Sequence, residues 1–77
     1  MQNTEGYQEE LTYREVQVLN YLAMGLTTIQ IAKQLSLGAE TIKTYRSNLL
    51  IKLECKNAFQ LGAKAEKYGY INKKYVA

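Results

Sequence analysis

The sequence contains no proline, no tryptophan and no histidine, and its 77 residues include one cysteine and five glycines. The absence of proline and the scarcity of glycine favour helices over a turn-rich sheet protein. A single cysteine, Cys55, cannot form an internal disulfide, and a zinc site of cysteine and histidine ligands is excluded. We therefore expect a chain that works in a reducing compartment, the cytoplasm.

Long apolar runs and catalytic motifs are also absent from the sequence. No apolar stretch approaches the roughly 20 residues that cross a bilayer, and residues 1–10 are too polar and acidic for a signal peptide. There is no glycine-rich phosphate loop and no metal-ligand cluster, and no base stands ready to activate Cys55. The sequence therefore predicts no enzyme, no cofactor or metal site, and no membrane partner.

What the sequence does have is an uneven distribution of charge. Three of its seven acids, Glu5, Glu9 and Glu10, lie in the first ten residues, which carry no base. The rest of the chain holds all ten bases against the four remaining acids, a net charge of +6. A basic body indicates binding to nucleic acid or to an anionic surface, and a solvated lysine-rich surface is the alternative.

Two segments begin with a capping-box pattern, in which a threonine is followed three residues later by Glu or Gln. The pattern at Thr12 predicts a first helix that ends near Gly25. The pattern at Thr27 predicts a second helix that ends at residues 36–38.

A third helix is expected over about 39–53, and Asn57 marks the start of a fourth helix that ends at Gly69. The apolar residues of these four segments recur at helical spacing, so one face of each helix is expected to be buried. The predicted buried residues are Val16, Val18, Leu19, Leu22, Ala23, Ile31, Ala32, Leu35, Ile42, Tyr45, Leu49, Leu53, Leu61, Ala65 and Tyr68.

The short break between the second and third helices is the most informative feature of the sequence. About three residues separate them, which forces the two helices to cross steeply, as in a helix-turn-helix. Ala32 supplies the small residue that close approach of two backbones needs, and Ile42 packs into the same junction. Burial of Ile42 turns Lys43, Thr44 and Ser47 to the opposite, exposed face of the third helix.

An exposed polar helix of this kind fits the major groove of DNA. Lys43 is expected to donate to guanine, Thr44 to exchange hydrogen bonds or touch a thymine methyl group, and Ser47 to contact bases one turn further along. Residues around this face are expected to hold phosphates. The predicted phosphate contacts are Thr27, Thr28, Thr41, Arg46 and Lys52.

Residues 11–53, LTYREVQVLNYLAMGLTTIQIAKQLSLGAETIKTYRSNLLIKL, resemble the LuxR-type, or GerE-like, helix-turn-helix domain. The family pattern is Leu-Thr-x-Arg-Glu, a Gly-Leu-Ser/Thr turn, Ile-Ala-x-x-Leu, Thr-Val-Lys and Asn-Ile-x-x-Lys-Leu, and the tail AKAEKYGYI is similar to its closing segment. The resemblance covers residues 11–71 without gaps. It leaves 1–10 as a flexible N-terminal lead-in and 72–77 as a C-terminal tail.

The resemblance implies an all-α, four-helix DNA-binding domain of a bacterial transcription regulator, with the recognition helix at about 39–53. It also implies a homodimer through the fourth helix, for which we expect contacts at Gly62, Ala63 and Glu66. No small-molecule ligand is expected within this chain. Most members attach this domain to a receiver or ligand-sensing domain, which the resemblance does not include. The chain therefore resembles either a stand-alone member or a part of a larger regulator.

Several residues depart from the family pattern. Gly38 stands where a capping Ser is usual, and Glu54 stands where Gly follows the third helix, so a left-handed turn is expected to be less comfortable there. Cys55 replaces Val and is expected to pack. Ile29, Leu50 and Ile51 are either scattered surface residues or a contact, in which Ile51 presses on a partner, on sugars or on thymine methyl groups.

Two other interpretations remain open at the level of the sequence. The chain could be a protein-interaction module that retains the helix-turn-helix fold and modulates another regulator without specific DNA binding. The retained bases Lys43, Arg46 and Lys52 argue against that loss. Region four of a sigma factor has a similar helix pair, but the promoter-binding segments that precede it there are missing here.

Overall fold

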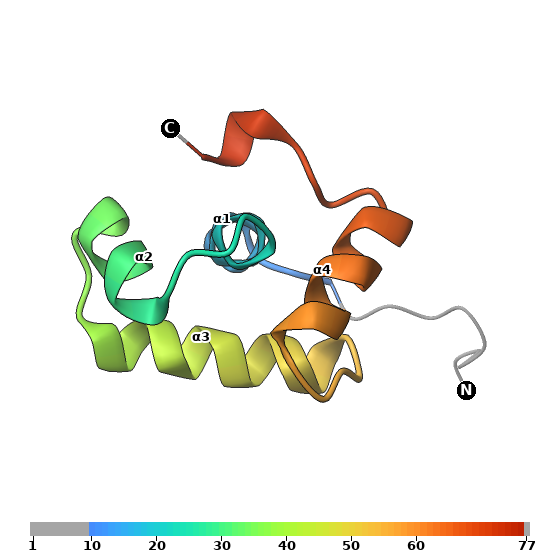
Figure 1. Ribbon diagram of the computed structural model, residues 1–77, viewed down its shortest axis with the longest axis horizontal. Coiled ribbons are helices and arrows are strands. Elements are labelled where there is room, and N and C mark those ends of the chain that lie inside the picture. The colour runs from blue at the N-terminus through green and yellow to red at the C-terminus, as the bar shows by residue number, and fades with distance from the viewer. Residues whose placement is uncertain (1–9, 77) are drawn as a thin grey trace.

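The computed structural model describes residues 10–76, so the predicted lead-in lies outside the described residues except for Glu10. The described chain forms α-helices and one short 3-10 helix, with no strand (Figure 1). The predicted all-α class with four α-helices is confirmed. The elements are α1 (Tyr13–Ala23), α2 (Thr28–Leu35), α3 (Ala39–Lys52), α4 (Ala58–Lys67) and the 3-10 helix η1 (Lys73–Tyr75).

The predicted caps begin the helices in the structure. The Thr12 hydroxyl accepts from the Glu15 amide at 3.1 Å, and the Glu15 carboxylate accepts from the Thr12 amide at 2.9 Å. Thr27 and Gln30 form the same reciprocal pair at the start of α2. These bonds satisfy amides that have no partner within the first turn of a helix. Asn57 caps α4 by accepting from the backbone amide three residues on, at 2.9 Å.

The breaks between helices use left-handed backbone. Gly25 and Gly69 have φ values of +92° and +80°, so both predicted glycine stops are confirmed. Two residues with side chains adopt the same region: Ser36 after α2, with φ +56°, and Glu54 after α3, with φ +54°. The backbone strain expected at Glu54 is therefore present, because this conformation crowds the β-carbon of any residue other than glycine.

The buried stripes of the helices meet in one core. Most of the predicted core is confirmed, and Leu35 and Tyr45 are half-buried against it. Buried apolar residues are Val16, Val18, Leu19, Tyr21, Leu22, Ile31, Ala32, Ile42, Leu49, Leu53, Leu61 and Ala65.

Two core predictions are wrong. Ala23 is exposed because the last turn of α1 borders an open groove. Tyr68 is exposed because α4 ends at Lys67 and the chain reverses at Gly69. The Tyr70 amide then bonds to the Ala65 carbonyl at 2.8 Å, and Tyr70 packs on the core in place of Tyr68.

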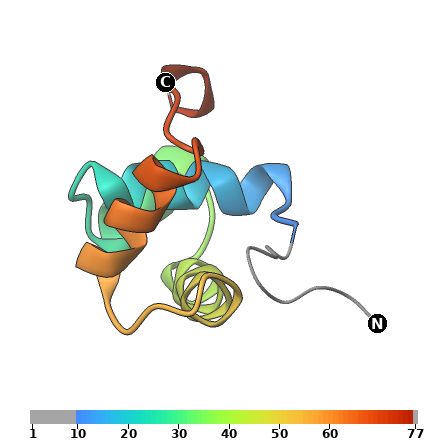
Figure 2. The same cartoon turned by 90° about the vertical axis from the view of Figure 1, so that its right-hand side faces the viewer.

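The helices are arranged around α1. In Figures 1 and 2, α3 runs along one side of α1, and the segment after α4 crosses the opposite side. Buried Asn20 holds this segment: its amide nitrogen donates to the Tyr70 carbonyl at 3.0 Å, and its oxygen accepts from the Asn72 amide at 2.9 Å. The rings of Tyr13 and Tyr75 lie 5.4 Å apart. The C-terminal residues therefore form part of the packed structure.

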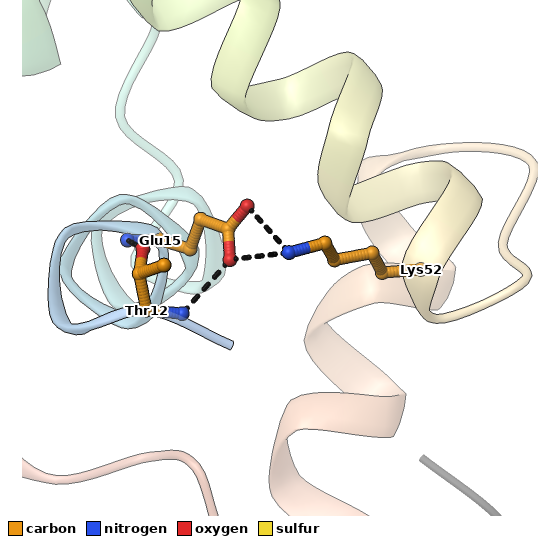
Figure 3. A network of polar contacts seen from close by, with 3 residues as sticks. All are labelled: Thr12, Glu15 and Lys52. Atoms are coloured by element: carbon orange, nitrogen blue, oxygen red, sulfur yellow. Dashed lines mark hydrogen bonds and ion pairs between the residues drawn. The ribbon is translucent and has the colours of Figure 1, made fainter. Parts of the chain in front are cut away.

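A buried ion pair joins the start of α1 to the end of α3 (Figure 3). The Lys52 ammonium lies 3.0 Å from each oxygen of Glu15, whose side chain is only 6% exposed. Burial is the largest single influence on this carboxyl and acts to raise its pKa. Hydrogen bonds from the Thr12 amide and from Lys52, with the Lys52 charge, outweigh burial, so the pKa of Glu15 is lowered from its ordinary 4.5.

No helix of the described residues is long and apolar enough to cross a membrane.

Replacement of Glu54 by Gly is expected to stabilise the fold, because glycine tolerates the left-handed conformation that the structure requires there. We expect Glu54→Gly to raise the free energy of unfolding by about 1 kcal/mol. Urea denaturation followed by circular dichroism measures the change. Gly69→Ala is the reciprocal control: it has open space for a β-carbon but a positive φ, so it should destabilise. A Glu54→Gly protein that is no more stable than the parent would contradict a strained left-handed conformation at residue 54.

Removal of the Lys52 ammonium is expected to leave a buried, unpaired carboxylate on Glu15. We expect Lys52→Met to lower the free energy of unfolding at pH 7 by about 3 kcal/mol, the low end for a broken buried pair, because the Lys52 side chain is 24% exposed. A carboxyl with a lowered folded pKa stabilises the fold above its ordinary pKa and loses that effect as pH falls through the folded value.

The difference between the parent and Lys52→Met should therefore shrink below pH 4.5, the ordinary carboxyl value. Urea titrations at pH 7 and pH 3 measure it. Lys43→Met is the matched control, since its pair with Glu40 is exposed on both sides and should matter little at either pH. A penalty that is independent of pH would exclude the ion pair as its cause.

Candidate nucleic-acid interface

The three predicted base-contact residues share one exposed face of α3. Lys43, Thr44 and Ser47 are all exposed. On the other side of the same helix, Ile42 and Leu49 are completely buried. Because residues three and four apart lie on one side of a helix, burial of the apolar stripe turns the polar residues outward together, as predicted.

The turn between α2 and α3 sets the direction of this face. Ser36 adopts the left-handed conformation, and the Leu37 amide bonds back to the Ala32 carbonyl at 2.9 Å. Ala32 itself is buried at the crossing, as predicted. Gly38 is the N-cap of α3 and makes no side-chain hydrogen bond. The first amides of α3 therefore lack the side-chain acceptor that a Ser would supply at this position.

Hydrogen bonds within α3 limit the further contacts that two of its exposed side chains can make. The Thr44 hydroxyl donates to the Glu40 carbonyl at 3.1 Å, which uses its only proton. Thr44 can then accept a hydrogen bond from a base, or present its methyl group. Lys43 lies 3.4 Å from the Glu40 carboxylate, and both side chains are largely exposed, so the pair is weak and the ammonium can turn to another acceptor.

The predicted phosphate contacts lie around this face with one exception. Thr27 and Thr41 are exposed, whereas Thr28 and Arg46 are half-buried. The Thr27 hydroxyl accepts from the Gln30 amide at 3.2 Å and keeps its own proton to donate. Thr27 and Thr28 also stand at the N-terminus of α2, where the helix dipole favours an anion.

Lys52 is the exception. Both of its oxygen partners belong to Glu15 inside the protein, at 3.0 Å. The Lys52 ammonium, predicted as a phosphate contact, is thus engaged in an internal ion pair with Glu15. The sequence indicates only the capping role of Glu15. Its ion pair with Lys52 could not be predicted, because it depends on how α1 packs on α3.

The predicted dimer residues border an apolar groove rather than a flat helix face. The groove has a volume of about 750 Å³ and lies between the end of α1, α4 and the C-terminal segment. Ala63 and Glu66 are exposed, and Phe59, one turn before Ala63, is 85% exposed. Gly62 lies at the floor, where an added β-carbon would stand 3.9 Å from the α-carbon of Ala23. Its small size therefore also serves packing within the chain.

Cys55 packs against the core, as expected. Its thiol lies 3.4 Å from the Leu53 carbonyl, and burial raises its pKa, against the opposing charge of Lys64. The thiol therefore stays protonated at neutral pH. Within residues 10–76, no group of three His, Cys, Asp or Glu side chains could hold a metal ion.

Sequence reasoning missed two features of this surface. Glu40 places an acid beside Lys43, which the spacing of three residues would have indicated. Phe59, 85% exposed on α4, is the second feature; the predicted dimer contacts include only small residues of this helix and Glu66. Its position one turn before Gly62 and Ala63 was the available signal.

Comparisons with known proteins agree with this geometry. Residues 9–65 match the GerE family model, described as bacterial regulatory proteins of the luxR family. A putative transcriptional regulator of Pseudomonas aeruginosa is 49% identical over 45 residues, which are 58% of this chain and 22% of that protein. The transcriptional regulatory protein UhpA of Salmonella typhimurium is 43% identical over 56 residues, 73% of this chain and 29% of that protein.

DesR of Bacillus subtilis, also a transcriptional regulatory protein, is 38% identical over 60 residues, 78% of this chain and 30% of that protein. The chain thus spans less than a third of the length of these relatives. Among solved structures, Vibrio cholera VqmA in complex with a ligand and DNA superposes with a TM-score of 0.77 and 27% identity, over 94% of this chain and 33% of that one.

The family model spans most of the chain, including the helix pair whose geometry is described above. The chain therefore belongs to the LuxR family of bacterial regulatory proteins, as a DNA-binding domain of a transcription regulator and not an enzyme.

Proposed function

We propose that this chain binds double-stranded DNA in a sequence-specific manner, with α3 in the major groove. The observation that carries the proposal is the exposed face of Lys43, Thr44 and Ser47 directly opposite the buried stripe of α3. A helix fixed by its apolar side to a small core presents its other side as a rigid reading surface. The likeness to a solved DNA complex supports the same partner.

The proposed contacts divide into two groups by chemistry. Lys43 donates to guanine after leaving Glu40, Thr44 accepts from an amino group of adenine or cytosine, and Ser47 reaches bases one turn further. Thr27, Thr28, Thr41 and Arg46 hold phosphates on either side of the groove. Because Lys52 is paired inside the protein, the proposed phosphate contacts rely on Arg46 and on the N-terminus of α2 for positive potential.

We propose further that two chains bind together through α4, with Phe59, Ala63 and Glu66 facing the partner and the groove beside them. These three residues lie at i, i+4 and i+7 on one face of α4. An exposed Phe beside an apolar groove is self-complementary across a two-fold axis, because each chain offers both the ring and the hollow. Most of this apolar surface would otherwise face water.

Replacement of Lys43 by Ala is expected to relax base preference at one position and to weaken binding at a preferred site by about 1–3 kcal/mol. The preferred site is first obtained by selection from random duplexes, and affinity is then measured by mobility shift at several salt concentrations. Lys74→Ala is the matched control, because η1 lies across α1 from α3 (Figure 1).

If no duplex is enriched and no duplex binds at low salt, the DNA proposal fails. The protein-interaction module that retains the fold then becomes the better account. A Lys43→Ala protein that selects the same site with the same affinity would remove Lys43 from the readout.

Replacement of Phe59 by Glu is expected to shift the chain toward the monomer, because a carboxylate cannot enter an apolar groove unpaired. Sedimentation velocity without DNA measures the shift over a range of protein concentrations. Ile29→Glu is the matched control, since Ile29 is 61% exposed on α2, away from the α4 surface. Equal self-association of the parent and the Phe59→Glu protein would contradict the proposed interface.

A further inference from the structure

Ile51 is an apolar side chain that the fold does not use. It lies in the last turn of α3 and is 73% exposed, although its neighbours in sequence pack inward or form ion pairs. Leu50 is half-buried against the core, and Leu53 is 2% exposed. The packed core of the described residues therefore does not include Ile51.

The position of Ile51 on α3 connects it to the proposed reading face. It follows Ser47 by four residues and Thr44 by seven, which are the spacings of one helix face. Leu49 and Leu53, which flank it, lie on the buried side. Ile51 thus extends the exposed strip of Lys43, Thr44 and Ser47 toward the C-terminal end of the helix.

The electrostatics at this end of α3 disfavour a phosphate as the partner of Ile51. The C-terminal end of a helix carries negative potential, which repels phosphate. Two lysines close to it are engaged within the protein: Lys52 with Glu15, and Lys64 with the Leu53 carbonyl at 2.7 Å. An uncharged, apolar group therefore suits Ile51 better than a phosphate does. In the major groove, the group of that kind is the C5-methyl of thymine.

We propose that Ile51 selects thymine through apolar contact with the C5-methyl group. The proposal rests on the proposed function, because it assumes that α3 lies in the major groove. Four residues of helix advance by about 6 Å, and base pairs are spaced by about 3.4 Å. The thymine should therefore lie about two base pairs beyond the pair that Ser47 contacts.

The test exchanges thymine for deoxyuridine, which differs only by the absence of the methyl group. Each thymine of the selected site is replaced in turn, and the affinities of the parent and of Ile51→Ala are measured by mobility shift. One replacement should weaken the parent about three- to fivefold, the effect of one buried methyl group. The same replacement should leave the affinity of Ile51→Ala unchanged, since the contact is already lost.

Ile29→Ala is the matched control, because Ile29 is also exposed but lies on α2. It should keep the full sensitivity to deoxyuridine. The change in the DNA leaves the protein untouched, so the result for the parent does not depend on how a variant folds.

The outcomes separate the two proposals. One result would overturn the role of Ile51 alone. In that result, binding to the selected site depends on Lys43, but no deoxyuridine replacement has an effect that Ile51→Ala abolishes. Loss of self-association in Ile51→Ala by sedimentation, with deoxyuridine sensitivity retained, would also overturn it and place Ile51 in a protein contact. A failure to enrich any site would overturn both proposals.

Discussion

The buried stripe of α3 is the constraint on which the rest of the structure depends. Ile42 and Leu49 are fully excluded from water, and Leu53 nearly so, because α1, α2 and α4 pack against α3. Rotation of α3 about its axis would expose these side chains at a cost of roughly 1.5–3 kcal/mol each. The exposed strip of α3 is therefore held in one orientation by the core, before any partner is present.

The charges of the protein serve two separate purposes. The basic excess of the sequence suggests a strongly positive surface, yet two cations are engaged within the protein: Lys52 with Glu15, and Lys64 with the end of α3. A cation that is paired inside the protein adds little to the attraction of a duplex. Under the proposed function, discrimination between DNA sequences would then depend on the short polar and apolar side chains of α3 rather than on net charge.

Because of the C-terminal segment, α1 is packed on two opposite sides. One side packs on α3, and the other holds the returning chain through Asn20 and through the contact of Tyr13 with Tyr75. The groove beside α4 exists because this segment returns, since Ile71 and Val76 form one of its walls. The groove proposed to receive a second chain is thus completed by residues beyond the last α-helix.

The sequence by itself determined the elements and their limits, because caps and left-handed stops act over three or four residues: Thr12, Thr27, Gly25 and Gly69 were all readable in advance. The exposed face of α3 that carries Lys43 could also be predicted, since the helical spacing of apolar residues within one segment shows which side is buried. Only the tertiary structure decided what Lys52 binds, why Tyr70 rather than Tyr68 packs inward, and where Asn20 holds the chain. Those outcomes join residues 37 and about 50 positions apart, and no local pattern records which distant group a side chain will meet.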